Sequence, residues 1–486
     1  MNTKKFCILH SNDMHGDFLA ELRASDGRQV GGLALLSGYI NKVRKEEENV
    51  IYVIAGDIVQ GALIDSEYKG ISSMAIMNYI APDVVALGNH EFDYGLPHLL
   101  FLEKVANFPI VNANLYIKSY NKRLMKPYVV LKKGGSDILV TGVITEKVMD
   151  SIKGDNLISS FVTLEEASQE VGKISNAYKN DDIDLTILLT HIGLESDIEL
   201  ANMLKPEWGI DLIIGGHSHT YMERPEYKNG IVIVHAGMGT DQIGRLDVVV
   251  DLDTNAIIDC QWRMVNIDDG LIQPDPGLER YIKSYQDQVD NKYNGMICKL
   301  AYEHTHPSRT VETSLGNLFT DALAEMAECD VMFLASGSIR SPSLGPLVTL
   351  KSMRTCFPYN DYLTRFTITG DQLKRIFGHI MRKENRAGEG ECYQVNGKIR
   401  AVYNDAERSL VDLRFDEEPV EDERKYTICL QAYHYRNSES YLKVTNEELQ
   451  KIKTKVVSTS TQEVLEEWLR NHQNEGRKIE GRLVYL

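Results

Sequence analysis

At 486 residues the chain exceeds the ~250–300 residues at which a single hydrophobic core stops growing, so at least two domains are expected. Its formal net charge of −17 disfavours a nucleic acid polymer as partner, because such binding depends on Lys and Arg neutralising phosphates. Since no apolar run approaches the ~18 residues of a membrane-spanning helix, we expect no membrane partner either.

The start of the chain has an apolar stretch too short for the hydrophobic region of a secretory signal. Only four apolar residues, 6–9, follow Lys4 and Lys5. The seven cysteines are an odd number, lie singly and form no CxxC pair, which is typical of a reducing compartment. These features predict a cytoplasmic protein.

Five runs of apolar and β-branched residues predict buried strands in the first part of the chain. They cover residues 6–9, 50–55, 84–87, 185–189 and 212–214. Open α/β sheets place their sites just past the carboxyl ends of strands, so polar residues that follow these runs are expected to converge. The polar residues in question are Asp13, His15, Asp57, Asn89, His90, His191, His217 and His219.

Seven of these side chains, all but His90, are expected to bind divalent metals. Two cations roughly 3.5–4 Å apart need a bridging carboxylate, and imidazole, carboxylate or amide groups to complete each shell. Asp57 is the natural bridge. The sequence therefore predicts a two-metal hydrolytic centre for manganese, zinc or iron, with one shell completed by Asp13, His15 and His219 and the other by Asn89, His191 and His217.

The order of these motifs resembles the calcineurin-type metallophosphoesterase domain of the 5′-nucleotidase family, which includes the bacterial UDP-sugar hydrolases. Residues 12–16 read NDMHG, 56–61 GDIVQG, 88–93 GNHEFD, 190–193 THIG and 216–219 GHSH. The resemblance implies an α/β fold, a four-layer α-β-β-α sandwich followed by a smaller α+β substrate-binding domain. It also implies that His90 and Asp93 form a catalytic pair, with His90 stabilising the transition state or protonating the departing alkoxide.

In function, the resemblance implies a metal-dependent phosphoric ester hydrolase of the 5′-nucleotidase type. Such an enzyme releases phosphate from nucleoside 5′-monophosphates or related nucleotides by attack of a hydroxide held by the metals. Cyclic nucleotides, nucleotide sugars and dinucleotides are alternative substrates for the same centre. An alternative of another class is a nucleotide-binding sensor without useful turnover, against which the complete metal set argues.

A domain boundary is expected after residue 272. Residues 273–277 (QPDPG) punctuate the chain, and the apolar residues that follow have helical spacing among charged residues. We therefore expect a catalytic domain over 1–272, a linker helix over 273–296 and a substrate-binding domain over 297–486. Within the last, residues 312–322 (ETSLGNLFTDA) match the family signature ExxLGNLxxDA, for which we expect a structural role.

Two segments of the second domain resemble phosphate-binding and loop motifs of the family. Residues 335–340 (ASGSIR) stand where the family has NxGxxR, and residues 356–361 (CFPYND) stand where it has a PFGN-like loop, which implies a substrate contact from Asn360. Arg340 and Arg365 are candidate phosphate ligands, because a guanidinium group pairs bidentately with phosphate oxygens. Pairing with a surface carboxylate is the alternative for both.

The family also clamps the nucleobase between two aromatic rings. Residues 391–397 (ECYQVNG) and 430–435 (LQAYHY) resemble the two clamp segments, so Tyr393 and Tyr433 are the expected rings, although tyrosines in strands also serve as sheet packing. Where the family commonly continues with NGGDG, this chain reads RNSES over 436–440. Glu439 is expected to replace the missing Asp, and the loss of both glycines predicts a reshaped pocket.

Overall fold

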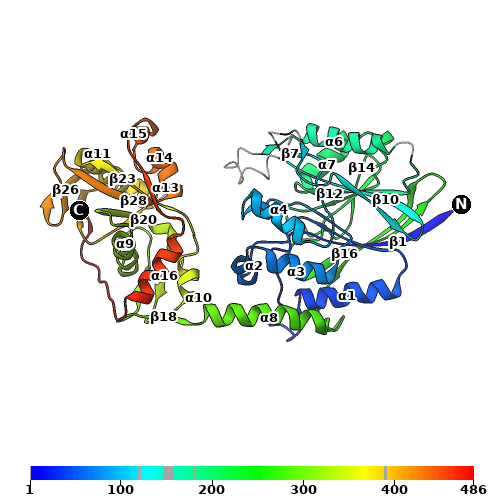
Figure 1. Ribbon diagram of the computed structural model, residues 1–486, viewed down its shortest axis with the longest axis horizontal. Coiled ribbons are helices and arrows are strands. Elements are labelled where there is room, and N and C mark those ends of the chain that lie inside the picture. The colour runs from blue at the N-terminus through cyan, green and yellow to red at the C-terminus, as the bar shows by residue number, and fades with distance from the viewer. Residues whose placement is uncertain are drawn as a thin grey trace. The chain divides into compact units, whose positions relative to one another are not determined.

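The computed structural model describes residues 2–117, 120, 122–145, 158–160, 163–178, 181–387 and 391–486. The chain folds into two compact units, Met1–Val289 and Asp290–Leu486 (Figure 1). Within the described ranges, no helix is both long enough and apolar enough to cross a bilayer.

The first unit is built on two six-stranded sheets. One has the order β17 (Ala256–Asn266), β16 (Gln242–Asp251), β1 (Thr3–Ser11), β4 (Val50–Ala55), β5 (Val84–Ala86) and β6 (Ile110–Val111). The other has the order β14 (Glu226–Lys228), β15 (Ile231–Val234), β13 (Leu212–Gly215), β12 (Leu185–His191), β10 (Ser136–Ile144) and β9 (Tyr128–Lys133). The central strands of each sheet are parallel, so their carboxyl ends lie along one edge.

The main core of this unit lies between the two sheets. Alternate residues of the strands, such as Phe6 and Ile8 of β1 and Ile138 and Val140 of β10, point into it and are at most 2% exposed. Because both faces of the central strands are covered, the strands are almost continuously apolar.

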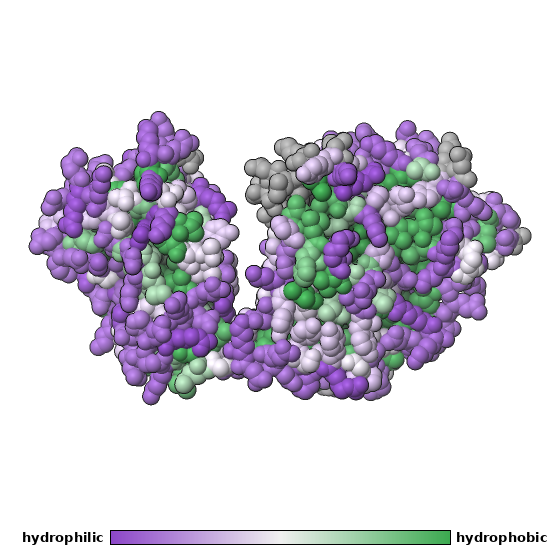
Figure 2. Space-filling model, in the orientation of Figure 1, coloured by the Kyte–Doolittle hydropathy of each residue, from purple (hydrophilic) through white to green (hydrophobic). Residues whose placement is uncertain are grey.

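Helices complete the layers on the outer faces. A second cluster of apolar residues joins α6 (Leu164–Ala177) and α7 (Leu194–Met203) to the outer face of the sheet that contains β12. On the side of the other sheet lie α1 (Leu33–Glu46), α2 (Leu63–Tyr68), α3 (Ile71–Ile80) and α4 (Leu96–Val105) (Figure 1). This layering confirms the predicted four-layer α-β-β-α sandwich. Hydrophilic residues form most of the outer rim of each unit on the face shown in Figure 2.

Helix α8 (Pro276–Tyr293) follows the sandwich and packs on it. Asp275 caps the helix by accepting hydrogen bonds from the backbone N–H groups of Gly277 (2.9 Å) and Leu278 (3.1 Å). Farther along, Tyr285 makes an edge contact with Tyr68 of α2, with ring centroids 5.2 Å apart. The division between the two units falls in the last turns of α8, between Val289 and Asp290.

The second unit combines sheets and helices, as predicted. A five-stranded sheet has the order β24 (Tyr393–Val395), β20 (Val331–Ala335), β28 (Lys425–Gln431), β23 (Leu363–Thr369) and β29 (Lys455–Ser458). A four-stranded sheet has the order β27 (Glu418–Pro419), β26 (Ser409–Phe415), β25 (Ile399–Asn404) and β30 (Leu483–Tyr485). The larger helices are α9 (Ser314–Ala327), α10 (Leu350–Cys356), α11 (Gly370–Ile380) and α16 (Thr461–Asn471).

The signature over residues 312–322 has a structural part in this unit. The buried Glu312 carboxylate accepts hydrogen bonds from Asn317 Nδ2 (2.6 Å) and from the backbone N–H groups of Glu480 and Arg482 (2.7 Å each). Asp321 of α9 pairs with the Arg482 guanidinium at 2.8 Å, and Arg482 is only 1% exposed. The signature thus fastens the segment before β30 to the start of α9.

Candidate active site

The predicted ligands lie past the carboxyl ends of strands from both sheets. Asp13 and His15 follow β1, Asp57 follows β4, and Asn89 follows β5. His191 is the last residue of β12, and His217 and His219 follow β13. Side chains from both sheets therefore meet at a single site.

The backbone at this site is unusual. Five residues that are not glycine have a positive φ and so lie in the left-handed region: Asp13 (51°), His15 (47°), Asp57 (55°), His217 (79°) and His219 (53°). Such a conformation costs of order 1–3 kcal/mol for each residue and persists where the surroundings enforce it. The orientation of these side chains therefore lowers the stability of the local fold.

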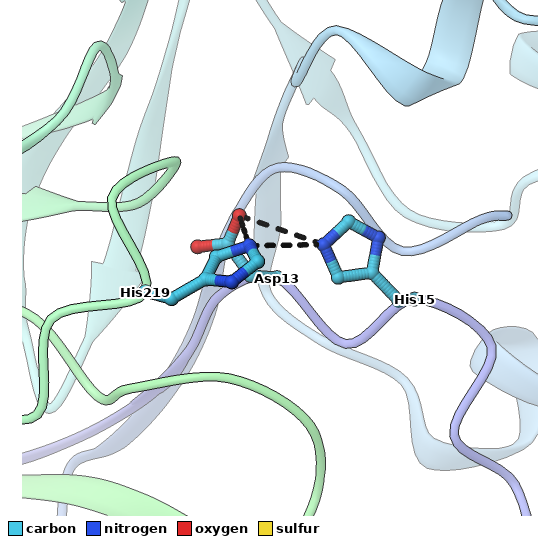
Figure 3. Close-up of side chains that lie close together, drawn as sticks. All are labelled: Asp13, His15 and His219. Carbon is cyan, nitrogen blue, oxygen red and sulfur yellow. Dashed lines mark hydrogen bonds and ion pairs between the residues drawn. The ribbon is translucent and has the colours of Figure 1, made fainter. Parts of the chain in front are cut away.

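The side chains converge on a small volume. His219 Nε2 lies 3.5 Å from Asp13 Oδ1, and His15 Nε2 lies 3.9 Å from the same oxygen (Figure 3). His191 Nε2 lies 3.0 Å from Asp57 Oδ2 and 3.7 Å from Asp13 Oδ1. Asp13, Asp57 and His191 are all buried, at most 2% exposed, so their charges are poorly screened by solvent.

These groups fit a pair of divalent cations. His191 Nδ1 donates to the carbonyl oxygen of Ala55 at 2.8 Å, which directs Nε2 toward the carboxylates. His15 Nε2 faces His219 Nε2 at 3.2 Å, and His217 Nδ1 faces Asn89 Oδ1 at 3.2 Å. Atoms that carry lone pairs are thus aimed at one another, as the ligands of metal ions are.

The two carboxylates also change the protonation of His191. Burial opposes protonation of the ring, but the charges of Asp57 and Asp13 outweigh it and raise the pKa of His191 above its ordinary value. A histidine must be deprotonated at its ligating nitrogen, so binding of a metal here displaces a proton.

The predicted catalytic pair is formed beside this group. His90 Nδ1 lies 2.7 Å from Asp93 Oδ2, and this hydrogen bond raises the pKa of His90. The backbone N–H of His90 donates to Asp57 Oδ1 at 2.9 Å, and its ring makes an edge contact with His15, with centroids 5.1 Å apart. With 32% of its side chain exposed, His90 is accessible to a ligand of the neighbouring cluster. This cluster, called the metal group below, consists of the seven predicted ligands Asp13, His15, Asp57, Asn89, His191, His217 and His219.

Glu91 is a site residue that sequence reasoning missed. Its buried carboxylate accepts hydrogen bonds from the backbone N–H groups of Asp57 (3.0 Å), Ile58 (2.8 Å) and Gly88 (2.6 Å). Burial raises the pKa of Glu91 to about 7, and the charge of Asp57 acts in the same direction. Glu91 lies inside the quoted GNHEFD motif, but the motif alone does not show which backbone groups it binds.

We predict that Glu91→Gln destabilises the first unit and weakens metal binding. A glutamine places an NH₂ group against at least one of the three backbone N–H donors, and a buried donor without an acceptor costs about 1–3 kcal/mol. The free energy of unfolding in urea and the metal dissociation constant measure the two effects. The exposed Glu48→Gln is the matched control, and equal stability of the two variants would contradict the role of Glu91.

The second unit contains a pocket of about 490 Å³. Its walls come from the ends of β20 and β28, from the loop before β23, and from α13 (Ala432–Arg436) and α14 (Ser438–Tyr441). Three residues predicted to bind substrate line it: Arg340, Asn360 and Tyr433. The other lining residues are Arg309, Ala335, Gly337, Ser338, Tyr359, Asp361, Glu391, Gln431, His434 and Tyr441.

Three other predictions for the substrate site need correction. Tyr393 is 1% exposed and belongs to the core, where its hydroxyl lies 2.7 Å from His434 Nδ1. Arg365 donates to the carbonyl oxygens of Ala327 (2.7 Å) and Glu328 (2.9 Å) at the end of α9, and it does not line the pocket. Glu439 is exposed on α14, outside the pocket lining.

Two aromatic rings line the pocket, and a carboxylate connects the two segments that carry them. Tyr359 and Tyr433 are 47% and 55% exposed, so their rings are available to a ligand. Asp361 Oδ2 accepts a hydrogen bond from the backbone N–H of Tyr433 at 2.6 Å, which ties the loop of Tyr359 to α13. The guanidinium of Arg340 lies over the Tyr359 ring, 5.9 Å from its centroid. Burial lowers the pKa of His434, which also lines the pocket, to about 4, so its ring is neutral.

Comparison with known proteins agrees with this organisation. Residues 7–221 match the family described as calcineurin-like phosphoesterase, and residues 297–446 match the 5′-nucleotidase C-terminal domain. A 5′-nucleotidase of Vibrio parahaemolyticus is 26% identical over 91% of this chain and 85% of its own, and a snake venom 5′-nucleotidase of Naja atra is 27% identical over 82% and 81%.

A solved structure shows the same fold over the whole chain. The crystal structure of a 5′-nucleotidase precursor from Thermus thermophilus is 22% identical and superimposes with a TM-score of 0.62. The match covers 99% of each chain.

Proposed function

We propose that this chain, which belongs to the 5′-nucleotidase family with its calcineurin-like phosphoesterase domain, releases phosphate from nucleoside 5′-monophosphates and related nucleotides. The observation that carries the proposal is the convergence of ligand-type side chains from two sheets, most of them on left-handed backbone. Such a group has no use in a protein that only binds nucleotides.

Divalent ions, when bound by these residues, would supply Lewis acidity toward phosphate oxygens. The residues that would hold the ions are Asp13, His15, Asp57, Asn89, His191, His217 and His219. These nitrogen and oxygen ligands suit manganese, zinc and iron, and we propose one of these as the resident metal.

His90 acts on the leaving group in this proposal. Its Nδ1 is held by Asp93, so its Nε2 is the ring atom left to face the substrate. The hydrogen bond with Asp93 favours the protonated ring, which donates a hydrogen bond or a proton to the departing oxygen.

The pocket of the second unit contributes groups suited to both the phosphate and the base of a nucleotide. Arg309 and Arg340 have planar guanidinium groups that can donate hydrogen bonds to phosphate oxygens. The rings of Tyr359 and Tyr433 offer faces on which a base can stack. Asp361 keeps the two ring-bearing segments at a set spacing through its hydrogen bond to Tyr433.

We expect the protein to release phosphate from at least one nucleoside 5′-monophosphate when loaded with manganese, zinc or iron. Phosphate release is measured across mononucleotides, nucleotide sugars, cyclic nucleotides, dinucleotides and a generic aryl phosphate. Tight binding of a nucleotide without turnover of any of these compounds would favour a nucleotide-binding protein and contradict the proposal.

We predict that His90→Asn lowers kcat by roughly 10²–10⁴-fold, the scale of a lost general acid, because asparagine cannot supply a proton. Bound metal stays near two ions per chain, as elemental analysis would show. His98→Asn is the control, since His98 lies on α4 outside the metal group. Unchanged turnover in His90→Asn would remove His90 from the mechanism.

We predict that Tyr433→Ala raises KM for nucleotides about tenfold or more, because stacking contributes ~1–3 kcal/mol per base. KM for a small aryl phosphate changes much less, since that compound has no base. Tyr227→Ala, an exposed tyrosine of the first unit, controls for the loss of a surface ring. Equal effects on both substrates would count against a base site at Tyr433.

A cytoplasmic location stays a prediction. All seven cysteines are free thiols, six of them buried, in keeping with a reducing compartment. One relative is a snake venom protein, so membership of the family does not decide the compartment.

A further inference from the structure

We propose that the hydrogen bond between Asp197 and His235 positions the turn over residues 215–219, which carries two of the predicted metal ligands. This inference rests on the proposed function, because it concerns the same metal group. Neither residue is one of the seven ligands or a member of the catalytic pair. They are positioning residues, which act through the backbone of the turn and not on the substrate.

Asp197 and His235 form a buried polar contact. Asp197 Oδ2 lies 2.7 Å from His235 Nε2, and both residues are 0% exposed. Because an ionised carboxylate only accepts hydrogen bonds, His235 donates from Nε2. Removing one partner would leave the other polar group buried without this hydrogen bond, which is costly. Each side chain therefore keeps the other in its place.

The elements that carry this pair lie on two sides of β13, the strand that leads into the turn. His235 directly follows β15, and Gly215 is the last residue of β13. The two strands are parallel neighbours, with Ile214 opposite Val234. Asp197 lies on α7, which packs on the outer face of the same sheet. The pair therefore connects α7 to the neighbouring strand across the end of β13.

Gly215 is the point at which the pair meets the turn. A Cβ atom placed on Gly215 would collide with both Asp197 Oδ2 and His235 Nε2. The hydrogen bond between these two atoms thus occupies the space in which any side chain at residue 215 would begin. The backbone of Gly215 is packed directly against the pair, so a shift of either side chain changes the support of this residue.

The next residue of the turn is packed against the ligands themselves. A Cβ atom placed on Gly216 would lie 2.9 Å from His191 Nδ1 and 3.0 Å from Asp13 Oδ2. The backbone N–H of His217 then donates to Asp13 Oδ2 at 2.8 Å. A single peptide step therefore separates the buried pair from the metal group, and a displacement of Gly215 is transmitted to the ligands.

The first turn of α7 holds the same segment through the backbone. The N–H of Gly193 donates to the carbonyl oxygen of Gly216 at 3.0 Å. The N–H of Leu194 donates to Ser218 Oγ at 3.1 Å. The N–H of Asp197 in turn donates to the carbonyl oxygen of Gly193 at 2.9 Å. Asp197 thus joins the backbone contacts of α7 with the turn to the side-chain contact with β15.

The test measures binding of Mn²⁺ to the metal-free, full-length protein by titration calorimetry. In His235→Leu, which removes the donor, we expect the dissociation constant of at least one ion to rise about tenfold or more, as when groups behind metal ligands are altered. Gly215→Ala weakens binding in the same way, because its Cβ displaces the pair. His235→Gln, which keeps a side-chain N–H donor, stays within about threefold of the wild type.

Leu200→Ala is the matched control for lost stability. Leu200 is a fully buried residue of α7 in the apolar cluster on the same face of the sheet, so its truncation leaves a cavity and destabilises the unit. We expect its Mn²⁺ affinity to stay within about threefold of the wild type. Urea unfolding of the metal-free variants measures how far each one is destabilised.

Wild-type affinity in His235→Leu, or an equal loss of affinity in Leu200→Ala, would overturn the positioning role alone. If His235→Leu does not fold, Asp197→Asn decides, because it keeps the size of the side chain and weakens the hydrogen bond. We expect a rise of about threefold or more in its dissociation constant, and wild-type affinity would overturn the role. Failure of the wild-type protein to bind divalent metal would instead overturn the proposed function, and this inference with it.

Discussion

The buried Glu91 carboxylate holds together two turns that carry ligand-type side chains. Through Glu91, the turn after β4 and the turn after β5 share one acceptor, so Asp57 and Asn89 keep their relative positions. The turn after β5 is also confined sterically, because any side chain at Gly88 would collide with the Asp57 carboxylate. Two hydrogen bonds tie the ligands of the second sheet to the first: His191 Nδ1 donates to the carbonyl oxygen of Ala55 (2.8 Å), and the backbone N–H of His217 donates to Asp13 Oδ2 (2.8 Å).

The two units contain functional side chains of different types. The first contains the strained backbone, the buried acids and the histidines, which are suited to phosphate chemistry and indifferent to the group that carries the phosphate. The second contains tyrosine rings, arginines and a carboxylate, which are suited to recognising a nucleoside phosphate. The departures from the family pattern lie in the second unit, which contains this pocket.

The convergence of these ligand-type side chains could be predicted from the sequence, because each of them ends or follows an apolar run that must be a buried strand. Their binding of metal stays a prediction. The substrate pocket could not be predicted to the same degree. Tyr393 and Arg365 lie in strands, and the side of a strand that faces the core depends on its pairing partners, which the sequence does not show. Glu391 and Arg309 have no strand or helix pattern around them, and only the closure of several loops brings them to one wall.

The hydrogen bonds between Glu312 and the segment before β30 have a consequence for the order of folding. Glu312 and Arg482 are 170 residues apart in the chain, and the parallel pairing of β30 with β25 depends on the same late segment. During synthesis the second unit therefore stays incomplete until residue 485 has left the ribosome, while the sandwich is already free to fold.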